Sequence, residues 1–219
     1  MKSLQLVVFD MAGTTIEDAG QVPEAFTTVL RRRGIEVSAD ELRAVRGASK
    51  RDAIRQLVRS RHNGDVEQVT ESIFQEFRDH LTELFQSGGV RPIPGARETF
   101  DWLRSQNVRV ALGTGFDRLT TDLIAEAVGW KESVVDAIVC GDDVPQGRPA
   151  PYLIFRAMEQ TGAIDVRQVA CIGDTVLDLQ AGNNSGAKGP GRQRHGMGSC
   201  FARPVPGCSK TRRKRMAGV

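Results

Sequence analysis

The chain contains no long hydrophobic run: no apolar stretch approaches the 18 residues of a transmembrane helix, so no membrane partner is expected. The apolar run at the N-terminus ends at Asp10 and has neither the length nor the cleavage site of a signal peptide. CxxC pairs and zinc-type spacings are also missing from the four cysteines, Cys140, Cys171, Cys200 and Cys208. These absences predict a cytoplasmic protein with reduced cysteines, of which Cys140 and Cys171 end apolar runs and are expected to be buried.

Acidic residues are absent from the C-terminal part of the chain. The 219 residues include 30 Lys and Arg against 27 Asp and Glu, a net charge of +3 that by itself suggests a polyanionic partner. Asp178 is the last acidic residue, and the 41 positions after it hold nine Lys or Arg. Residues 1–178 therefore carry 21 basic and 27 acidic groups, a net charge of −6. The basic character belongs to a tail, which disfavours nucleic acid as a partner of the main body.

Four short apolar runs predict the strands of a buried sheet. They are Leu4–Phe9, Val108–Leu112, Val134–Cys140 and Val169–Ile172, and a helical pattern follows each of them. Continuous apolar runs of this length are typical of strands that are covered on both faces. Strands that alternate with helices are joined by right-handed crossovers, so the pattern predicts an α/β fold with a doubly wound, Rossmann-like parallel sheet.

One interval, residues 17–94, contains helical patterns only. Ser38-Ala39-Asp40-Glu41 is a capping box, and apolar residues recur at steps of three or four from Asp65 to Gln86. A helical insertion after the first strand predicts a separate domain at 17–94, with the core formed by 1–16 and 95–189. Gly and Pro concentrate at the two expected hinges, Glu17–Pro23 and Gly88–Pro94.

Polar residues follow each predicted strand, at the sheet edge where open α/β folds bind ligands. This set consists of Asp10, Thr114, Arg148, Asp174 and Asp178. A carboxylate can attack phosphorus, and carboxylates with a backbone carbonyl can hold Mg²⁺. A hydroxyl, backbone N–H groups and a cation can neutralise the phosphoryl oxygens. The sequence therefore predicts phosphoryl transfer that depends on Mg²⁺.

These residues also carry a family resemblance. The motifs, in chain order, are Asp10-x-Ala12-Gly13-Thr14, Thr114, Arg148-Pro149 and Gly173-Asp174-Thr175-x-x-Asp178. Together they resemble the four motifs of the haloacid dehalogenase-like (HAD) hydrolase superfamily, over residues 4–188. The helical insertion resembles the C1 cap domain of that superfamily. The resemblance implies a hydrolase with an aspartyl-phosphate intermediate.

Two positions resemble the phosphonatase-like (phosphonoacetaldehyde hydrolase-like) branch. Most phosphatases of the superfamily have an acidic residue two positions after the nucleophile, and here that residue is Ala12. Gly47-Ala48-Ser49-Lys50 resembles the cap segment whose lysine forms a Schiff base with the substrate, so that the iminium accepts electrons as the C–P bond breaks. The histidine that assists this lysine in phosphonatase is replaced by Ala53. This departure favours the broader group, whose substrate need not be phosphonoacetaldehyde.

The resemblance assigns roles to the residues at the sheet edge. Asp10, Lys50 and Arg148 are the expected catalytic residues; Thr114, Gly115 and Arg148 bind the phosphoryl group; Asp10, the Ala12 carbonyl and Asp174 hold Mg²⁺; and Asp178 supports the site. The expected partner is a small phosphorylated or phosphonate substrate, and a homodimer stays open. One alternative function is a phosphomonoesterase without Schiff-base chemistry. The other is an inactive or truncated product whose basic tail binds polyanions.

Purely structural roles compete with several of these assignments. Asp10 could cap a helix, and the segment at Thr114 could be a plain turn. Arg148 could pair with a surface carboxylate, and Lys50, beside an arginine, could lie on a solvated helix face. Asp178 could either support the metal site or place negative charge at a helix N-terminus.

The tail at residues 190–219 has a composition unlike the rest of the chain. It holds eight Lys or Arg, five Gly and three Pro, and no acidic residue, Leu or Ile. It could be a polyanion-binding arm or a disordered segment. A third hypothesis is a shift of reading frame, because relatives continue here with a further hydrophobic strand. In that case the C-terminal edge of the core sheet is missing, and translation of the other frames after Gly189 tests the idea.

Overall fold

Four short apolar strands form one parallel sheet in the computed structural model, which describes residues 4–61, 64–130 and 133–188. The strands are β1 (Leu6–Asp10), β2 (Arg109–Gly113), β3 (Ala137–Val139) and β4 (Val169–Ile172), in the order β3-β2-β1-β4. The predicted α/β fold with a parallel sheet is confirmed. The third strand is shorter than predicted, because Val134 and Val135 are buried but precede the ladder.

Alternate residues of β1 face opposite sides of the sheet, as the period of two requires. Val7 and Phe9 belong to one apolar cluster, whereas Leu6 and Val8 belong to the other. Phe9 packs edge-on against Phe100, with ring centroids 5.3 Å apart. Both sides of β1 are therefore covered, which explains why its sequence is apolar throughout.

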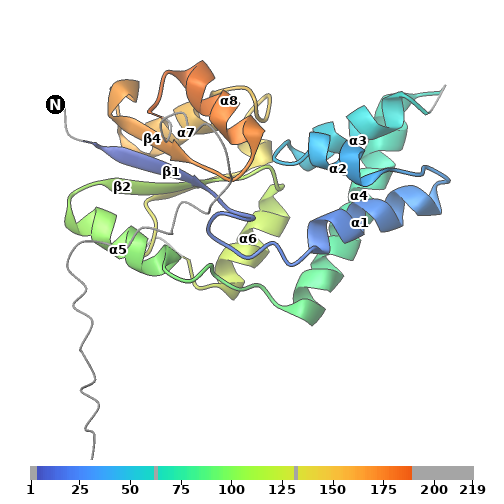
Figure 1. Cartoon of the computed structure of the whole chain (residues 1–219), viewed down its shortest axis with the longest axis horizontal. Helices are drawn as coiled ribbons and strands as arrows, with labels where there is room; N and C mark the ends of the chain where they lie inside the picture. The colour runs from blue at the N-terminus through green and yellow to red at the C-terminus, as the bar shows by residue number, and fades with distance from the viewer. Residues whose placement is uncertain (1–3, 62–63, 131–132, 189–219) are drawn as a thin grey trace, which may run out of the picture.

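Helices cover both faces of the sheet (Figure 1). Helices α5 (Ala96–Ser105) and α6 (Arg118–Ala127) lie on one face, and α7 (Tyr152–Thr161) and α8 (Val176–Ser185) lie on the other. Single 3-10 turns at Gly141–Asp143 and Val166–Gln168 complete the connections. The carboxyl ends of the strands point toward the remaining helices of the chain.

These remaining helices form the insertion between β1 and α5. They are α1 (Gln21–Arg32), α2 (Ala39–Ala44), α3 (Lys50–Arg59) and α4 (Val66–Gly88), and we call them the inserted helices. Helix α4 packs along both α1 and α3. Phe26 of α1 and Phe77 of α4 have ring centroids 4.4 Å apart. The expected capping box is present, since the Ser38 and Glu41 side chains and backbone N–H groups bond reciprocally at the start of α2.

The two segments that join the inserted helices to the sheet lie side by side. Ile16 and Pro92 form an antiparallel bridge. The Glu17 N–H donates to the Arg91 carbonyl at 2.9 Å, and the Ile93 N–H donates to the Thr15 carbonyl at 2.9 Å. The insertion therefore leaves and re-enters the core at one place. This geometry suits a pair of hinges, and the boundaries at 17 and 94 stay a prediction.

Strand β4 lies at an edge of the sheet among the described residues. Its outer side is joined by Lys188, which bridges to Ala170 in parallel orientation. The Lys188 N–H donates to the Val169 carbonyl at 2.8 Å, and its carbonyl accepts from the Cys171 N–H at 3.0 Å. Lys188, the last described residue, therefore forms a single-residue parallel bridge on the outer side of β4. The tail hypotheses for residues 190–219 lie outside the described residues.

Within the described residues, no helix has the length and apolar character needed to cross a bilayer.

The two cysteines that the structure describes are free thiols: Cys140 is buried and Cys171 is half-buried. Burial raises the pKa of Cys140 to about 11 and that of Cys171 to about 12, which keeps both thiols protonated. Cys200 and Cys208 lie outside the described residues.

Candidate active site

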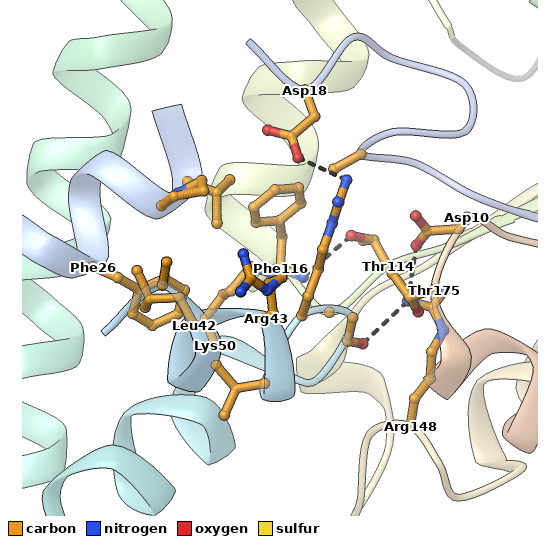
Figure 2. Close-up of a pocket in the computed structure, with 18 residues that line it drawn as sticks. Asp10, Asp18, Phe26, Leu42, Arg43, Lys50, Thr114, Phe116, Arg148 and Thr175 are labelled. Carbon is orange, nitrogen blue, oxygen red and sulfur yellow. Dashed lines mark hydrogen bonds and ion pairs between the residues drawn. The ribbon is translucent and has the colours of Figure 1, made fainter. Parts of the chain in front are cut away.

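The carboxyl ends of three strands bring the predicted site residues to one edge of the sheet. Asp10 is the last residue of β1, Thr114 follows β2, and Asp174 and Asp178 follow β4. Asp10, Thr114 and Asp178 are buried, and Asp174 is half-buried. In Figure 2 the side chains of Asp10, Thr114 and Arg148 lie together on one side of a cavity. The fold therefore gathers residues that are 164 positions apart in the sequence, from Asp10 to Asp174.

Arg148 pairs with two of these carboxylates. Its Nη1 atom lies 2.8 Å from Asp10 Oδ1, and its Nε atom lies 2.8 Å from Asp178 Oδ1. The Nη2 atom donates to the Gly113 carbonyl at 2.7 Å. The Arg148 side chain is only 7% exposed, so these partners compensate a buried charge. The competing expectation of a surface pair is wrong, since Arg148 pairs with buried carboxylates of the site.

Burial also changes the protonation of the predicted nucleophile. It raises the pKa of Asp10 to about 7, while the opposite charge of Arg148 acts to lower it. The like charges of Asp178 and Asp174 raise it further. A carboxyl group surrounded by other carboxylates is stabilised as an anion by added positive charge. The site therefore favours a cation beside Asp10.

Three carboxylates can supply such a cation with ligands. Asp10, Asp174 and Asp178 each offer an oxygen, and these oxygens lie within 4.8 Å of one another. An all-oxygen set of this kind suits a hard divalent cation. Gly13 keeps the space open, because a Cβ atom there would lie 2.6 Å from Asp174 Oδ2. The residues present therefore fit a divalent metal, and Ala12, whose carbonyl is a predicted ligand, lines the same cavity.

Asp178 caps a helix and pairs with Arg148, and its support of a metal site stays a prediction. Its Oδ2 atom accepts hydrogen bonds from the Thr175 N–H at 3.1 Å and from the Thr175 hydroxyl at 2.5 Å. The Thr175 hydroxyl in turn accepts from the Asp178 N–H, which completes a capping box at the start of α8. Because its other oxygen binds Arg148, Asp178 both caps the helix and orients the arginine of the site.

Lys50 extends from the inserted helices into the cavity. It is the first residue of α3, is 9% exposed, and lines the cavity together with Asp10. Its ammonium nitrogen lies 4.5 Å from the centre of the Phe116 ring. The backbone N–H of Lys50 donates to the Gly115 carbonyl at 3.0 Å. Burial lowers the pKa of Lys50 to about 8, against the opposing effect of Asp10. The competing expectation of a solvated surface lysine is wrong.

Gly115 allows the inserted helices to approach the sheet closely. A Cβ atom at this position would lie 2.3 Å from the carbonyl oxygen of Ala48. Gly47 has the same function on the other side of the contact, because a Cβ atom there would lie 2.5 Å from Thr175 Oγ1. Gly115 lines the cavity. Its predicted phosphate contact stays a prediction, and its packing against Ala48 is a role that the sequence did not reveal.

Arg46 is a site residue that the sequence analysis missed. It comes from the segment between α2 and α3, and its Nη2 atom lies 2.9 Å from both Asp18 Oδ2 and Asp174 Oδ2. It thereby joins the inserted helices to the carboxylate that follows β4. Arg46 immediately precedes the Gly47–Lys50 segment, but its partners are far away in sequence, so no local pattern distinguished it from the other arginines.

The cavity between the inserted helices and the sheet has a volume of about 260 Å³. Figure 2 shows Asp10, Thr114 and Arg148 on one side of it, and Phe26 and Leu42 on the opposite side. Thr175, Phe116 and Lys50 also line it. A buried carboxylate, a buried amine and a buried arginine thus line one cavity, which is the arrangement expected of an active site.

The fold and this cavity define an α/β enzyme with an acidic site at the carboxyl edge of its parallel sheet. Residues 4–186 match the haloacid dehalogenase-like hydrolase family. The chain belongs to this family and is a hydrolase. The resemblance drawn from the four motifs is therefore confirmed.

Named relatives place the chain near one branch of the family. The chain is 32% identical to a phosphonoacetaldehyde hydrolase of Bacillus cytotoxicus, over 84% of this chain and 73% of that protein. Among solved structures it resembles a hydrolase from Pseudomonas syringae, with a TM-score of 0.74 and 23% identity over 84% of this chain and 83% of that one. It also resembles a phosphonoacetaldehyde hydrolase-like protein from Oleispira antarctica, with a TM-score of 0.73 and 23% identity over 86% and 72% of the two chains. The phosphonatase-like relationship is thus confirmed.

Proposed function

We propose that this hydrolase cleaves the C–P bond of a small organic phosphonate that carries a carbonyl group, with Asp10 as nucleophile and Lys50 as Schiff-base lysine. The observation that carries the proposal is the burial of Lys50 in the same cavity as Asp10. An amine whose pKa is lowered to about 8 is partly neutral near pH 7, as attack on a carbonyl requires. Ala12 supports the same chemistry, since it leaves no acid to protonate an ester oxygen.

The proposed reaction proceeds through covalent intermediates on Lys50 and Asp10. The neutral Lys50 amine attacks the carbonyl carbon and water leaves, which forms an imine that is protonated to the iminium. The Asp10 carboxylate attacks phosphorus, the C–P bond breaks, and its electron pair moves into the iminium to form an enamine on Lys50. Protonation at carbon and addition of water release the carbonyl product. A second water hydrolyses the aspartyl-phosphate, which releases phosphate and restores Asp10.

The other residues orient these groups. In this proposal Arg148, which pairs with Asp178, binds the phosphoryl oxygens and favours the ionised form of Asp10, and the Thr114 hydroxyl and Gly115 N–H are further donors. Asp10, Asp174 and the Ala12 carbonyl would hold Mg²⁺, which when bound balances the charge of the phosphoryl group. The inserted helices act as a cap in this proposal, excluding bulk water from the iminium.

Borohydride trapping tests the assignment. Reduction in the presence of phosphonoacetaldehyde should attach the substrate covalently at Lys50, identified by peptide mass spectrometry. Lys50→Arg keeps the charge but should abolish both trapping and phosphate release. Asp10→Asn should still be trapped but release no phosphate. Full phosphate release from phosphonoacetaldehyde by Lys50→Arg would exclude the Schiff base. Phosphate release from small phosphate esters alone, unchanged in Lys50→Arg, would support the phosphomonoesterase alternative.

A further inference from the structure

The cavity continues past Lys50, away from Asp10, into a region with a different character. Apolar side chains from the inserted helices form its wall: Val22 and Phe26 from α1, Leu42 from α2, and Val45 just after α2. Figure 2 shows Phe26 and Leu42 gathered on the side opposite Asp10 and Arg148. A substrate whose phosphorus lies at Asp10 therefore directs its leaving group toward this apolar wall.

The whole cavity is larger than a phosphonate with a two-carbon aldehyde requires. The cavity measures about 260 Å³, whereas an engineered protein cavity of about 150 Å³ accommodates benzene. A phosphoryl group and a two-carbon fragment leave much of the apolar wall without contact. Uncovered apolar surface contributes nothing to binding, so the wall indicates a leaving group with a longer carbon chain.

An arginine that is next in sequence to the apolar Leu42 also lines the cavity. Arg43 of α2 lines it and, among the described residues, pairs with Asp40 one turn earlier on the same helix. The side chains of Arg43 and Asp40 are 69% and 84% exposed, so this pair is weak. Arg46 differs, because it already holds both Asp18 and Asp174. Arg43 is therefore the arginine of this cavity whose charge is available to a ligand.

We propose, on the basis of the function proposed above, that the leaving group is an amphipathic carbonyl compound with an apolar chain against Phe26 and Leu42 and a terminal carboxylate bound by Arg43. The chain would have roughly four to six carbon atoms, given the space available. Arg43 forms charge-assisted hydrogen bonds with this carboxylate in place of its exposed partner Asp40. Arg43 is then a specificity-determining residue that a neutral two-carbon leaving group does not need.

Two matched ligands test this inference by binding. The compounds are 4-oxo-5-phosphonopentanoate and its neutral amide, which differ only in the terminal charge. Calorimetry on the full-length Asp10→Asn chain, which cannot turn the ligand over, gives both dissociation constants. We expect the carboxylate to bind about tenfold more tightly than the amide. Adding Arg43→Gln should reduce this preference to about twofold or less.

Arg97→Gln is the matched control, because Arg97 is also an exposed helical arginine with an ion-paired partner on its own helix, Asp101. It should leave the tenfold preference unchanged. Equal binding of acid and amide, or a preference that survives Arg43→Gln, would overturn the inference.

The proposed function has a separate readout. Phosphate release from phosphonoacetaldehyde by the wild type, without any preference for the carboxylate ligand, overturns only the inference. A carboxylate preference that depends on Arg43, without C–P cleavage of any phosphonate, supports the binding region and refutes the proposed reaction.

Discussion

Arg46, from the inserted helices, and Asp174, from the loop after β4, are joined by an ion pair of 2.9 Å across the cavity. The same guanidinium nitrogen also lies 2.9 Å from Asp18, in the segment that leads into α1. Asp174 is a predicted ligand of the divalent cation. One oxygen of Asp174 thus interacts with a cation of the protein itself. We therefore expect the position of the inserted helices and the binding of a divalent cation to be coupled through Asp174.

Replacement of Arg46 by alanine should strengthen divalent-cation binding. The change removes a positive charge that competes for Asp174 Oδ2, so we expect Mn²⁺ to bind about three- to tenfold more tightly. Titration followed by electron paramagnetic resonance measures the free ion without any need for turnover. Arg43→Ala is the control, since Arg43 pairs with Asp40 instead of Asp174, and it should leave the affinity unchanged. Weaker binding by Arg46→Ala would show that the arginine supports the metal site.

Replacement of Lys50 by methionine should stabilise the protein at neutral pH. Because the pKa of Lys50 is lowered from 10.5 to about 8 on folding, burial of the charge costs on the order of 3 kcal/mol below pH 8. The cost disappears as the pH rises from about 8 to 10.5, where the unfolded chain also loses the proton. Urea unfolding at pH 7 and at pH 9.5 measures it.

The stability gain of Lys50→Met should therefore be largest at pH 7 and smaller at pH 9.5. Arg51→Met, at the neighbouring and more exposed position, is the control, and its difference from the wild type should not vary in this way. A gain that is equal at both values of pH would contradict a lowered pKa of Lys50.

Loss of Asp178 should destabilise the core strongly. Asp178→Ala removes a buried partner of Arg148 and the capping box of α8, for an expected cost of about 3 to 5 kcal/mol. The free energy of unfolding in urea measures this cost. Glu41→Ala is a matched control, because Glu41 occupies the same position in the solvent-exposed capping box of α2 and should cost much less. Equal losses in the free energy of unfolding would mean that burial of Asp178 and its pair with Arg148 add no stability.

Alanine at Gly115 should separate the inserted helices from the sheet. Its Cβ atom would lie 2.3 Å from the Ala48 carbonyl oxygen, so the backbone at this contact must move apart. The Lys50 N–H, which donates to the Gly115 carbonyl, should then exchange with solvent faster, as hydrogen exchange with mass spectrometry detects. Gly182→Ala should leave this exchange unchanged, because its Cβ atom would make an ordinary contact 3.5 Å from Cys171.

The order of the elements and most of the site could be predicted from local patterns. Apolar runs beside Gly, Asp and Thr clusters predicted the strands, because burial on both faces requires a continuous apolar sequence. Once the strands are known, the common location of Asp10, Thr114 and Asp174 can be predicted, because the carboxyl ends of parallel strands meet at one edge of the sheet. The predicted boundaries of β3 were less accurate, because the buried residues that precede its hydrogen-bonded pairing with β2 have the same apolar composition as the strand itself.

Only the tertiary structure decided what each charged side chain contacts. Lys50 and Arg51 are neighbours in sequence, yet one is buried beside Phe116 and the other is 40% exposed. Arg43 and Arg46 are three positions apart in the sequence, yet only Arg46 contacts Asp174. Sequence patterns report which residues share a helix face or a strand end. Burial, pKa and ion pairing depend on the neighbours that the fold brings from distant positions, and these neighbours determine which charges become chemically active.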